Sequence, residues 1–590
     1  MGVKSCFRRF FNAEIWKFKD SLITVLVPLL FLPLIVIDGE DDIPTTDGSG
    51  VVYSSKKVAR FGYTLIVMGI YWITECLPLP VTAVLPYVLY PLLGLRSAGS
   101  VSINYMKNTN FLLFGGLMVA ISIETSELHR RLALLTLKIV GSSPRRLLLG
   151  FMLIGWFLSM WISNTAAAAM TIPIAIAVID ELKKTEEDAQ KGIENASFEE
   201  ADKNEIEVVE ETDFDRIEVK PKRSKKSSKA ENIGKAILLA IPYACSVGGT
   251  STLTGTAPNL VLNEYWAEQY PDSPISLSYT EWMGFGIVNS ICILIVMIVY
   301  LNVFFIGIRC DSNKEEEIAV SKMIERKYKE LGKISMEELI VLITFITLVI
   351  MWFFRSPGFM NGWTVLFPEP SFISDGVPAV FFGVLLFLFP AEKSGFWKCP
   401  QEGPPARAIH SWKSLNEKMH WGILLLIGAG FAMADGSDAS GFSTWVAKIL
   451  ADLVGDLEKW AIVLVVTIVA ALFTEICSNT AAASLFIPIL GALAKELCLH
   501  PLSLLMPAVL ACSLSFMLPA ATPPNAIAFG SGRLKVTDMI KSGAMANIIG
   551  ILIVNLITAS YGAAYFDFND EDFVNWANFT SCPGYNKTRI

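Results

Sequence analysis

Charged side chains are scarce in this chain. They make up 18% of its 590 residues, whereas a soluble protein has about a quarter. Hydrophobic residues reach 53% and are gathered in blocks, at 21–37, 61–76, 147–162, 283–308, 336–354, 461–473 and 543–562. Runs of about 18 to 25 apolar residues span a bilayer, and shorter runs form core or re-entrant helices. The composition excludes a soluble protein and predicts an all-α polytopic membrane protein with about 11 transmembrane helices.

Histidine is rarer still, and cysteine shows no metal-binding pattern. The histidines are His129, His410, His420 and His500, all in or beside polar segments. The ten cysteines lack paired or metal-ligand spacing, and several lie inside apolar runs as small hydrophobic residues. A membrane enzyme needs a nucleophile with its base or a metal cluster, and a channel needs a filter or a charged ring. We therefore expect neither class, no cofactor and no nucleic-acid partner.

Charge at the two ends of the chain predicts its orientation. Five basic residues precede the first apolar block, and an acidic Gly-Glu-Asp-Asp sequence follows it. The bias of basic residues toward the cytoplasm places the N-terminus there. The tail carries two glycosylation sequons, at Asn578 and Asn586. We therefore expect an extracellular C-terminus, an odd number of spans and a place in the plasma membrane.

An internal repeat organises the sequence. Ser163-Asn164-Thr165, the first Ser-Asn-Thr motif, recurs as Ser478-Asn479-Thr480, the second motif, with an offset of 315 residues. Each motif is followed by three alanines and then by Ile-Pro-Ile. Downstream, the sequence Thr256-Ala-Pro-Asn resembles Thr522-Pro-Pro-Asn. Duplicated halves are typical of secondary transporters, whose sites form where the repeats meet.

A charged insert separates the two motifs of the first half. From Asn164 to Asn259 is 95 residues, whereas from Asn479 to Asn525 is 46. The excess matches the charged stretch 183–229, which contains few apolar residues. We therefore predict a cytoplasmic loop there that is disordered.

The repeated motifs have the chemistry of a site for an anion and a cation. Ser, Asn and Thr are costly in lipid unless they are paired. A single triplet would be explained by packing between helices, but its repetition at matching places favours a binding site. Proline breaks a helix, and the break frees carbonyl groups for a cation and N-terminal amides for an anion.

No Lys or Arg occurs in any of the four motifs. A polyvalent anion bound there would lack a fixed counter-charge, and cotransported cations are one way to supply it. Inward movement of each net positive charge also gains about 2.3 kcal/mol per 100 mV. These residues favour cation-coupled transport.

Four carboxylates lie within or at the ends of apolar runs: Glu75, Glu124, Asp435 and Glu475. An ionisable residue in a span is a functional candidate, and the alternative is a structural carboxylate that caps a half-helix. Glu475 is the strongest candidate because it lies between Thr474 and the second Ser-Asn-Thr motif.

At these motifs the chain resembles the divalent-anion/sodium symporter family, and within it the animal sodium–dicarboxylate and sodium–citrate cotransporters. The similarity covers nearly the whole chain. It rests on Trp-Ile-Thr-Glu-Cys-Leu-Pro-Leu from Trp72, on the two Ser-Asn-Thr motifs, on Leu-Thr-Gly-Thr-Ala-Pro-Asn-Leu from Leu253, on Met-Leu-Pro-Ala-Ala-Thr-Pro-Pro-Asn-Ala-Ile from Met517, and on Trp576-Ala.

The resemblance implies a fold, a mechanism and a site. The fold would be two inverted repeats, each with a re-entrant hairpin ending in Ser-Asn-Thr and an unwound span, divided into a scaffold and an elevator-type transport domain in a homodimer. Substrate carboxylates would contact Ser163, Asn164, Thr165, Thr256, Ser478, Asn479, Thr480 and Thr522. Two sodium ions would lie near Ser159, Ser163, Asn164 and Gly255, and near Thr474, Cys477, Asn479 and Ala521.

This reading divides the chain into seven segments. They are 1–58, the N-terminal cytoplasmic segment, first span and outer loop; 59–182, the first repeat with its hairpin; 183–233, the charged loop; 234–310, the rest of the first repeat; 311–420, the scaffold of the second repeat; 421–565, the second hairpin and unwound span; and 566–590, the glycosylated tail.

The implied function is import of di- or tricarboxylates such as succinate and citrate, coupled to several Na⁺ ions and electrogenic. Ala257-Pro258 and Thr522 match carboxylate carriers of the family. Ala429 and Thr480 depart from its usual pattern, which leaves the choice between dicarboxylate and citrate open. A sodium–sulfate cotransporter and a sodium-independent carboxylate exchanger remain alternatives.

Overall fold

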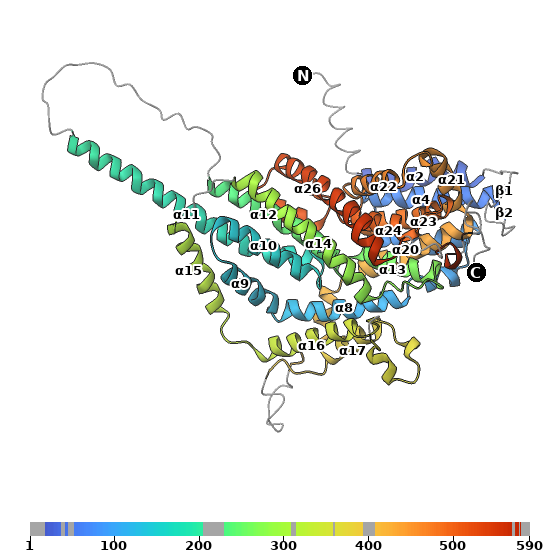
Figure 1. Cartoon of the computed structure of the whole chain (residues 1–590), viewed down its shortest axis with the longest axis horizontal. Helices are drawn as coiled ribbons and strands as arrows, with labels where there is room; N and C mark the ends of the chain where they lie inside the picture. Colours follow the sequence, from blue (N-terminus) through green and yellow to red (C-terminus); the bar gives the residue numbers. More distant parts are fainter. Residues whose placement is uncertain are drawn as a thin grey trace, which may run out of the picture.

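The computed structural model describes residues 18–36, 42–44, 52–204, 229–307, 314–357, 360–392, 407–568, 573–577 and 579. These residues are almost all helical, as predicted (Figure 1). The exception is a hairpin of two short antiparallel strands, β1 (Asp42–Pro44) and β2 (Val52–Ser54). Seven helices among the described residues are long and apolar enough to cross a membrane. This confirms a polytopic helical protein, and the predicted total of spans stays a prediction.

The helices of the first half are α2 (Lys19–Phe31), α3 (Pro33–Val36), α4 (Ser55–Thr74), α5 (Leu79–Ala83), α6 (Leu85–Leu93), α7 (Ala98–Ile103), α8 (Asn108–Thr125), α9 (Leu128–Val140), α10 (Pro144–Ser159), α11 (Asn164–Asn204), α12 (Lys229–Gly249), α13 (Ala257–Gln269) and α14 (Tyr279–Leu301), followed by the π-helix η1 (Asn302–Ile306).

The second half contains α15 (Lys314–Glu330), α16 (Met336–Phe353), η2 (Trp363–Leu366), η3 (Pro370–Phe372), α17 (Gly376–Leu385), α19 (Trp412–Lys418), α20 (Trp421–Ser440), α21 (Phe442–Val454), α22 (Lys459–Thr474), α23 (Asn479–Glu496), α24 (Pro501–Ala511), α25 (Pro523–Gly530), α26 (Val536–Ile557), η4 (Thr558–Gly562), α27 (Ala563–Tyr565) and α28 (Phe573–Trp576).

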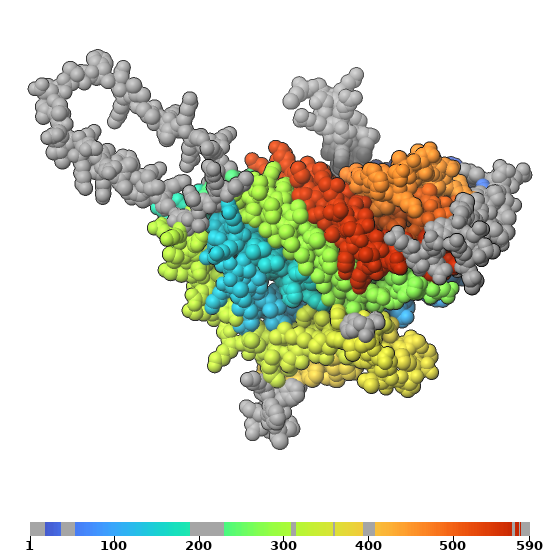
Figure 2. Space-filling view, in the orientation of Figure 1, coloured from blue at the N-terminus to red at the C-terminus, as the bar shows by residue number. Residues whose placement is uncertain are grey.

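The same packing occurs in both halves. In the first half α12 packs between α10 and α11, and in the second half α24 packs between α22 and α23. Both α12 and α24 are buried along nearly their whole length, so the core is built around them. The halves also meet where α14 packs along α26, which Figure 2 shows as green and red surfaces side by side.

Glycine allows α14 and α26 to approach the broken segments that follow α12 and α24. A Cβ added to Gly286 of α14 would lie 2.8 Å from the carbonyl oxygens of Thr250 and Ser251. A Cβ added to Gly543 of α26 would lie 2.2 Å from the Phe516 oxygen. A real side chain has no room at either place, so each glycine is required by a close backbone contact.

Helix α11 corrects one prediction. It continues to Asn204, and α12 begins at Lys229, so 183–204 and 229–233 are helical where a disordered loop was predicted. Figure 1 shows α11 extending well beyond the packed helices. The reason is local: residues 181–204 are rich in Glu, Lys and Ala, which favour helix without tertiary packing. The rest of the predicted loop lies outside the described residues, as do the sequons at Asn578 and Asn586.

Candidate functional site

Each Ser-Asn-Thr motif lies at the turn between two packed helices. Residues 160–163 join α10 to α11, and residues 475–478 join α22 to α23. In each turn the serine caps the helix that follows. The Ser163 hydroxyl accepts the amide of Ala166 at 3.2 Å, and the Ser478 hydroxyl accepts the amide of Ala481 at 3.3 Å. Serine at an N-cap satisfies an amide that the helix leaves free, so the motif itself defines where each second helix begins.

The residue five positions before each asparagine fixes that side chain. Ser159 donates its hydroxyl to Asn164 Oδ1 at 2.5 Å, and Thr474 donates to Asn479 Oδ1 at 2.9 Å. Both donors are fully buried, whereas all six residues of the two motifs are half-buried. The motif residues are therefore held from the protein side and still partly open to a ligand.

The predicted breaks in the helices are present in both halves. Residues 250–256, the first break, separate α12 from α13, and residues 512–522, the second break, separate α24 from α25. Thr256 and Thr522 end the breaks in nearly the same extended conformation, with φ of −148° and −143°. Each is the N-cap of the helix that follows. This confirms the interruption that the Thr-Ala-Pro-Asn and Thr-Pro-Pro-Asn sequences predicted.

One asparagine cross-braces each break. Asn259 Nδ2 donates to the carbonyl oxygens of Gly249 at 3.1 Å and of Thr252 at 2.8 Å. Asn525 Nδ2 likewise donates to two carbonyl oxygens, at 2.9 and 3.0 Å. Their residues lie ten and seven positions before Asn525, the same separations as for Asn259. In both asparagines Oδ1 is buried and has no partner among the described residues. The two breaks are therefore the same structure built twice.

The turns lie directly against the breaks. In the first half Thr252 donates its hydroxyl to the Met160 carbonyl at 2.5 Å, and a Cβ added to Gly249 would lie 2.5 Å from Asn164 Oδ1. A Cβ added to Gly255 would in turn lie 2.5 Å from the backbone carbonyl oxygen of Gly249. Three of the predicted sodium residues, Ser159, Asn164 and Gly255, are thus brought together.

The second half repeats this contact with different side chains. Thr474 donates its hydroxyl to the Cys512 carbonyl at 2.7 Å, and Ser515 donates to Asn479 Oδ1 at 3.2 Å. Cys477 is buried in the turn, and Ala521 is buried in the break. The structure therefore joins Thr474 and Asn479 directly to the second break, and it adds Ser515, which the sequence motifs did not single out.

The helices that begin at these motifs pack across the two repeats. Helix α11, which starts at Asn164, packs against α25, and α23, which starts at Asn479, packs against α13. Each break therefore leads into a helix that lies on the hairpin of the other repeat. Helix N-termini carry partial positive charge and free amides, which favour an anion even without Lys or Arg.

Glu475 has a structural role in the second break. Its buried carboxylate accepts the backbone amides of Phe516 at 2.8 Å, Met517 at 3.0 Å and Leu518 at 3.2 Å. Asn547 Nδ2 on α26 donates to the same carboxylate at 2.7 Å. This is a structural role, as the alternative from the sequence held, but the carboxylate holds the unwound break and does not cap a helix end. The sequence gives no signal for Asn547, because it lies in an apolar run and the aligned position of the first half is a serine.

Two of the other three carboxylates form ion pairs, and the third, Glu75, lies close enough to Cys477 of the second turn to interact with it electrostatically. Glu124 forms an ion pair with Lys418 at 3.0 Å, and Asp435 forms one with Arg96 at 2.6 Å. Glu75 ends α4 in a left-handed conformation, with φ of 51°. None of them has a hydrogen bond to a motif residue among the described contacts.

The histidines do not form a catalytic site. His500 is surrounded by the rings of Trp266, Phe568, Phe573 and Trp576, and burial lowers its pKa to about 4. Burial also lowers the pKa of His410. Within the described part of the chain no group of His, Cys, Asp and Glu is arranged to hold a metal cluster.

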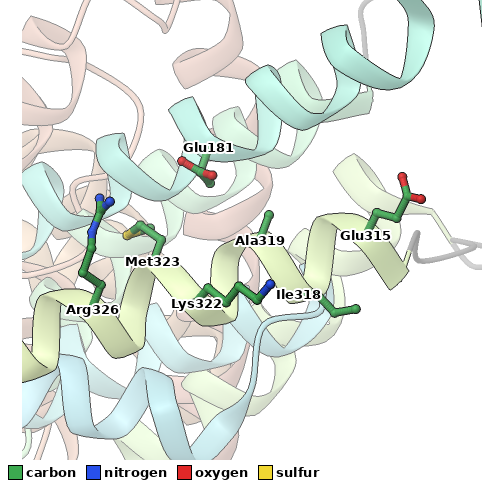
Figure 3. A pocket seen from close by; sticks show the side chains of 7 residues that line it. All are labelled: Glu181, Glu315, Ile318, Ala319, Lys322, Met323 and Arg326. Carbon is green, nitrogen blue, oxygen red and sulfur yellow. The ribbon is translucent and has the colours of Figure 1, made fainter. Parts of the chain in front are cut away.

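An open hollow of about 480 Å³ lies between α11 and α15, away from the motifs (Figure 3). Glu181 of α11 faces it from one side, and Lys322 and Arg326 of α15 lie on the other. Its side chains are long and largely exposed, and the hollow is open to solvent. It offers no enclosed site and does not compete with the duplicated motifs.

Known proteins resemble this chain along nearly its whole length. The family model described as the sodium:sulfate symporter transmembrane region matches residues 26–566. The chain is 38% identical to human solute carrier family 13 member 2 over 586 residues, covering 95% of both chains. It is 38% identical to the rat Na⁺/citrate cotransporter (96% of this chain, 98% of the relative) and 36% identical to the rat Na⁺/dicarboxylate cotransporter 3 (96% and 95%).

Two solved structures resemble the model in fold alone. The Alcanivorax borkumensis YdaH transporter matches with a TM-score of 0.51 at 13% identity, covering 92% of this chain and 99% of that one. The Neisseria gonorrhoeae MtrF efflux pump matches with a TM-score of 0.51 at 11% identity, covering 91% and 94%.

Proposed function

The chain belongs to the sodium:sulfate symporter family, and we propose that it imports di- and tricarboxylate anions, such as succinate and citrate, together with Na⁺. It is a transporter and not an enzyme. The observation that carries the proposal is the duplicated site, in which an asparagine at each hairpin turn is fixed against an unwound, asparagine-braced break.

The anion is bound by hydroxyls, amides and helix ends. Ser163, Asn164 and Thr165 face one part of the substrate, and the second Ser-Asn-Thr motif faces another. Thr256 and Thr522, the N-caps of α13 and α25, complete the set; the Thr522 hydroxyl is buried and has no partner among the described residues. Carboxylate groups accept hydrogen bonds from such donors, and the positive ends of the helices offset their charge.

The cations are bound where each turn meets its break. One Na⁺ lies near Ser159, Ser163, Asn164 and Gly255. The other lies near Thr474, Cys477, Asn479 and Ala521. The supporting observation is the donor chemistry, because hydroxyl, amide and backbone oxygens gathered at an unwound helix are the ligands that suit Na⁺. Na⁺ ions offset the substrate charge at a site with no Lys or Arg, and transport is electrogenic because more Na⁺ ions enter than are needed to neutralise the anion.

The transport domain consists of the two hairpins, the broken helices and α14 and α26, and it moves as an elevator against a scaffold in a homodimer. Supporting this, the hairpins pack across the repeats into one body centred on α12 and α24. The N-terminus is cytoplasmic and the C-terminus extracellular in the plasma membrane. Cys498, in the turn after α23, is disulfide-bonded, which suits an extracellular position for that turn.

Uptake by cells that express the chain tests this function. Radiolabelled succinate, citrate and sulfate are supplied with external sodium or with choline in its place, and the membrane current is recorded. We expect sodium-dependent uptake of succinate or citrate with an inward current. Uptake of sulfate alone would contradict the carboxylate assignment, and carboxylate uptake indifferent to sodium would identify an exchanger.

A further inference from the structure

A second cavity, of about 280 Å³, lies at the other end of the helices that form the site. Its walls are the part of α11 around Lys183, the first turns of α12 around Lys235, and the loop from Gly532 to Lys535 between α25 and α26. Lys183 is 19 residues along α11 from Asn164, and Lys235 is 14 residues before Gly249. At 1.5 Å per residue the cavity is about 20–30 Å from the motifs.

Four cationic side chains line this cavity, and only part of their donor capacity is used. Arg533 Nη2 pairs with Asp180 at 2.7 Å, and Lys235 pairs with Glu231 at 3.1 Å and with Asp538 at 3.5 Å.

The remaining donors have no acceptor among the described residues. Arg533 Nη1 is buried without a hydrogen-bond partner. Lys183 and Lys535 form no ion pair within the described part of the chain. An unpaired buried guanidinium nitrogen costs free energy, which an anion in the cavity would recover. A guanidinium with two nearby ammonium groups suits a phosphate, which accepts several charged hydrogen bonds at once.

The surroundings favour a lipid as the source of that phosphate. Val536 and Ile540, on the first turns of α26 beside the loop, are apolar and 41% and 37% exposed. They offer a surface for acyl chains next to the cationic cavity. The cavity also lies at the end of α11 and α12 that leads into the charged insert, the face that the sequence places in the cytoplasm. Residues 220–229 of that insert carry six Lys and Arg and no acid, which attracts anionic inner-leaflet lipid.

We propose that this cavity binds the phosphorylated headgroup of an anionic lipid of the inner leaflet. Lys183, Arg533 and Lys535 hold the phosphate, and the acyl chains lie along Val536 and Ile540. The site consists only of described residues. Because α11 and α12 run without interruption from the cavity to the motifs, the lipid binds to the same body that carries the substrate.

Native mass spectrometry of the purified full-length chain tests the proposal. The probe is short-chain phosphatidylinositol bisphosphate, with short-chain phosphatidylcholine and soluble inositol trisphosphate as comparisons. We expect the Lys183→Gln/Lys535→Gln double variant to bind the bisphosphate about 30-fold more weakly than the wild type, since each cation contributes about fivefold. Lys184→Gln, which changes the exposed neighbour of Lys183 outside the cavity, should bind as the wild type does.

A second variant helps to distinguish weaker lipid binding from misfolding. Arg533→Lys keeps the charge beside Asp180 and removes the unpaired nitrogen, and we expect about fivefold weaker binding. Sodium-dependent succinate uptake shows separately that each variant folds, so failure of the lipid site is distinguishable from failure of transport. Equal binding by wild type and double variant would overturn the proposal. Equal binding of soluble inositol trisphosphate and lipid would overturn the lipid assignment.

Discussion

The two repeats share their backbone architecture but differ in what stabilises the break. In the first repeat the backbone around Thr250 and Ser251 is held by neutral groups. Trp282 Nε1 donates to the Thr250 carbonyl at 3.1 Å, and the hydroxyl of Ser251 donates to that of Ser290 at 2.7 Å. In the second repeat the Glu475 carboxylate instead accepts the backbone amides of Phe516, Met517 and Leu518.

The difference can be traced to single aligned positions. Met160 occupies in the first turn the place that Glu475 occupies in the second, 315 residues later. Ser290 and Asn547 are likewise matched, because both lie four residues after the glycine that touches the break, Gly286 or Gly543. The duplicated part is the site proposed to bind substrate, and of the two breaks only the second is held by a buried carboxylate among the described residues.

The largest effect should come from the asparagines that both repeats share. We expect Asn164→Ala and Asn479→Ala each to lower sodium-dependent succinate uptake about 100-fold, because losing a charged hydrogen bond costs about 3 kcal/mol. Uptake is measured beside surface biotinylation. Thr171→Ala, whose hydroxyl bonds only within α11, should retain uptake. Loss in one half alone would show that the repeats are not functionally equivalent.

The unmatched carboxylate should give the next effect. Glu475→Gln places an amide donor against the backbone amides of 516–518, and we expect a loss of stability of about 3 kcal/mol and roughly tenfold weaker sodium dependence. Thermal unfolding in detergent measures the loss of stability. The sodium concentration at half-maximal uptake measures the change in sodium dependence. Glu124→Gln, at a half-exposed ion pair, is the matched control and should cost no more than about 1 kcal/mol. Similar losses in both variants would contradict a special role for Glu475.

The bracing asparagines should behave alike. Asn259→Ala and Asn525→Ala each remove two hydrogen bonds to buried carbonyls, and we expect both to lose about 2 kcal/mol of stability. Thermal unfolding midpoints of the two variants should fall by similar amounts. A much larger shift for Asn259→Ala would show that the carboxylate of the second repeat can replace the brace.

The smallest effect should come from exchanging the matched hydroxyls. Ser159→Thr and Thr474→Ser keep the donor to Asn164 and Asn479 and change only one methyl group. We expect the sodium half-saturation of either variant to change by no more than about fourfold, because a methyl group is worth about 0.8 kcal/mol. A tenfold change in one half would mean that packing, and not the donor, defines that cation site.

Repetition explains what could be predicted from the sequence. The Ser-Asn-Thr motifs and the two breaks recur at fixed offsets, so their positions, and the likeness of the two halves, were predictable. The role of Glu475 was not, because its partners at 516–518 and Asn547 are far along the chain and have no matched pattern. The same holds for Ser515.

The length of α11 was missed for a different reason. A charged segment with few apolar residues predicts disorder, yet many residues of this one are good helix formers on their own. Low hydrophobicity excludes a core but does not exclude a helix that continues from one already packed, because the costly first turn has been formed.

Glu475 also bears on the electrical behaviour of the carrier without any ligand. Its carboxylate accepts four N–H groups through its two oxygens, and a carboxylate carries one negative charge. In the proposed elevator movement this charge crosses part of the membrane field, worth up to about 2.3 kcal/mol per 100 mV. A voltage step applied without sodium or substrate should therefore drive a transient capacitive current, and that current should vanish in Glu475→Gln.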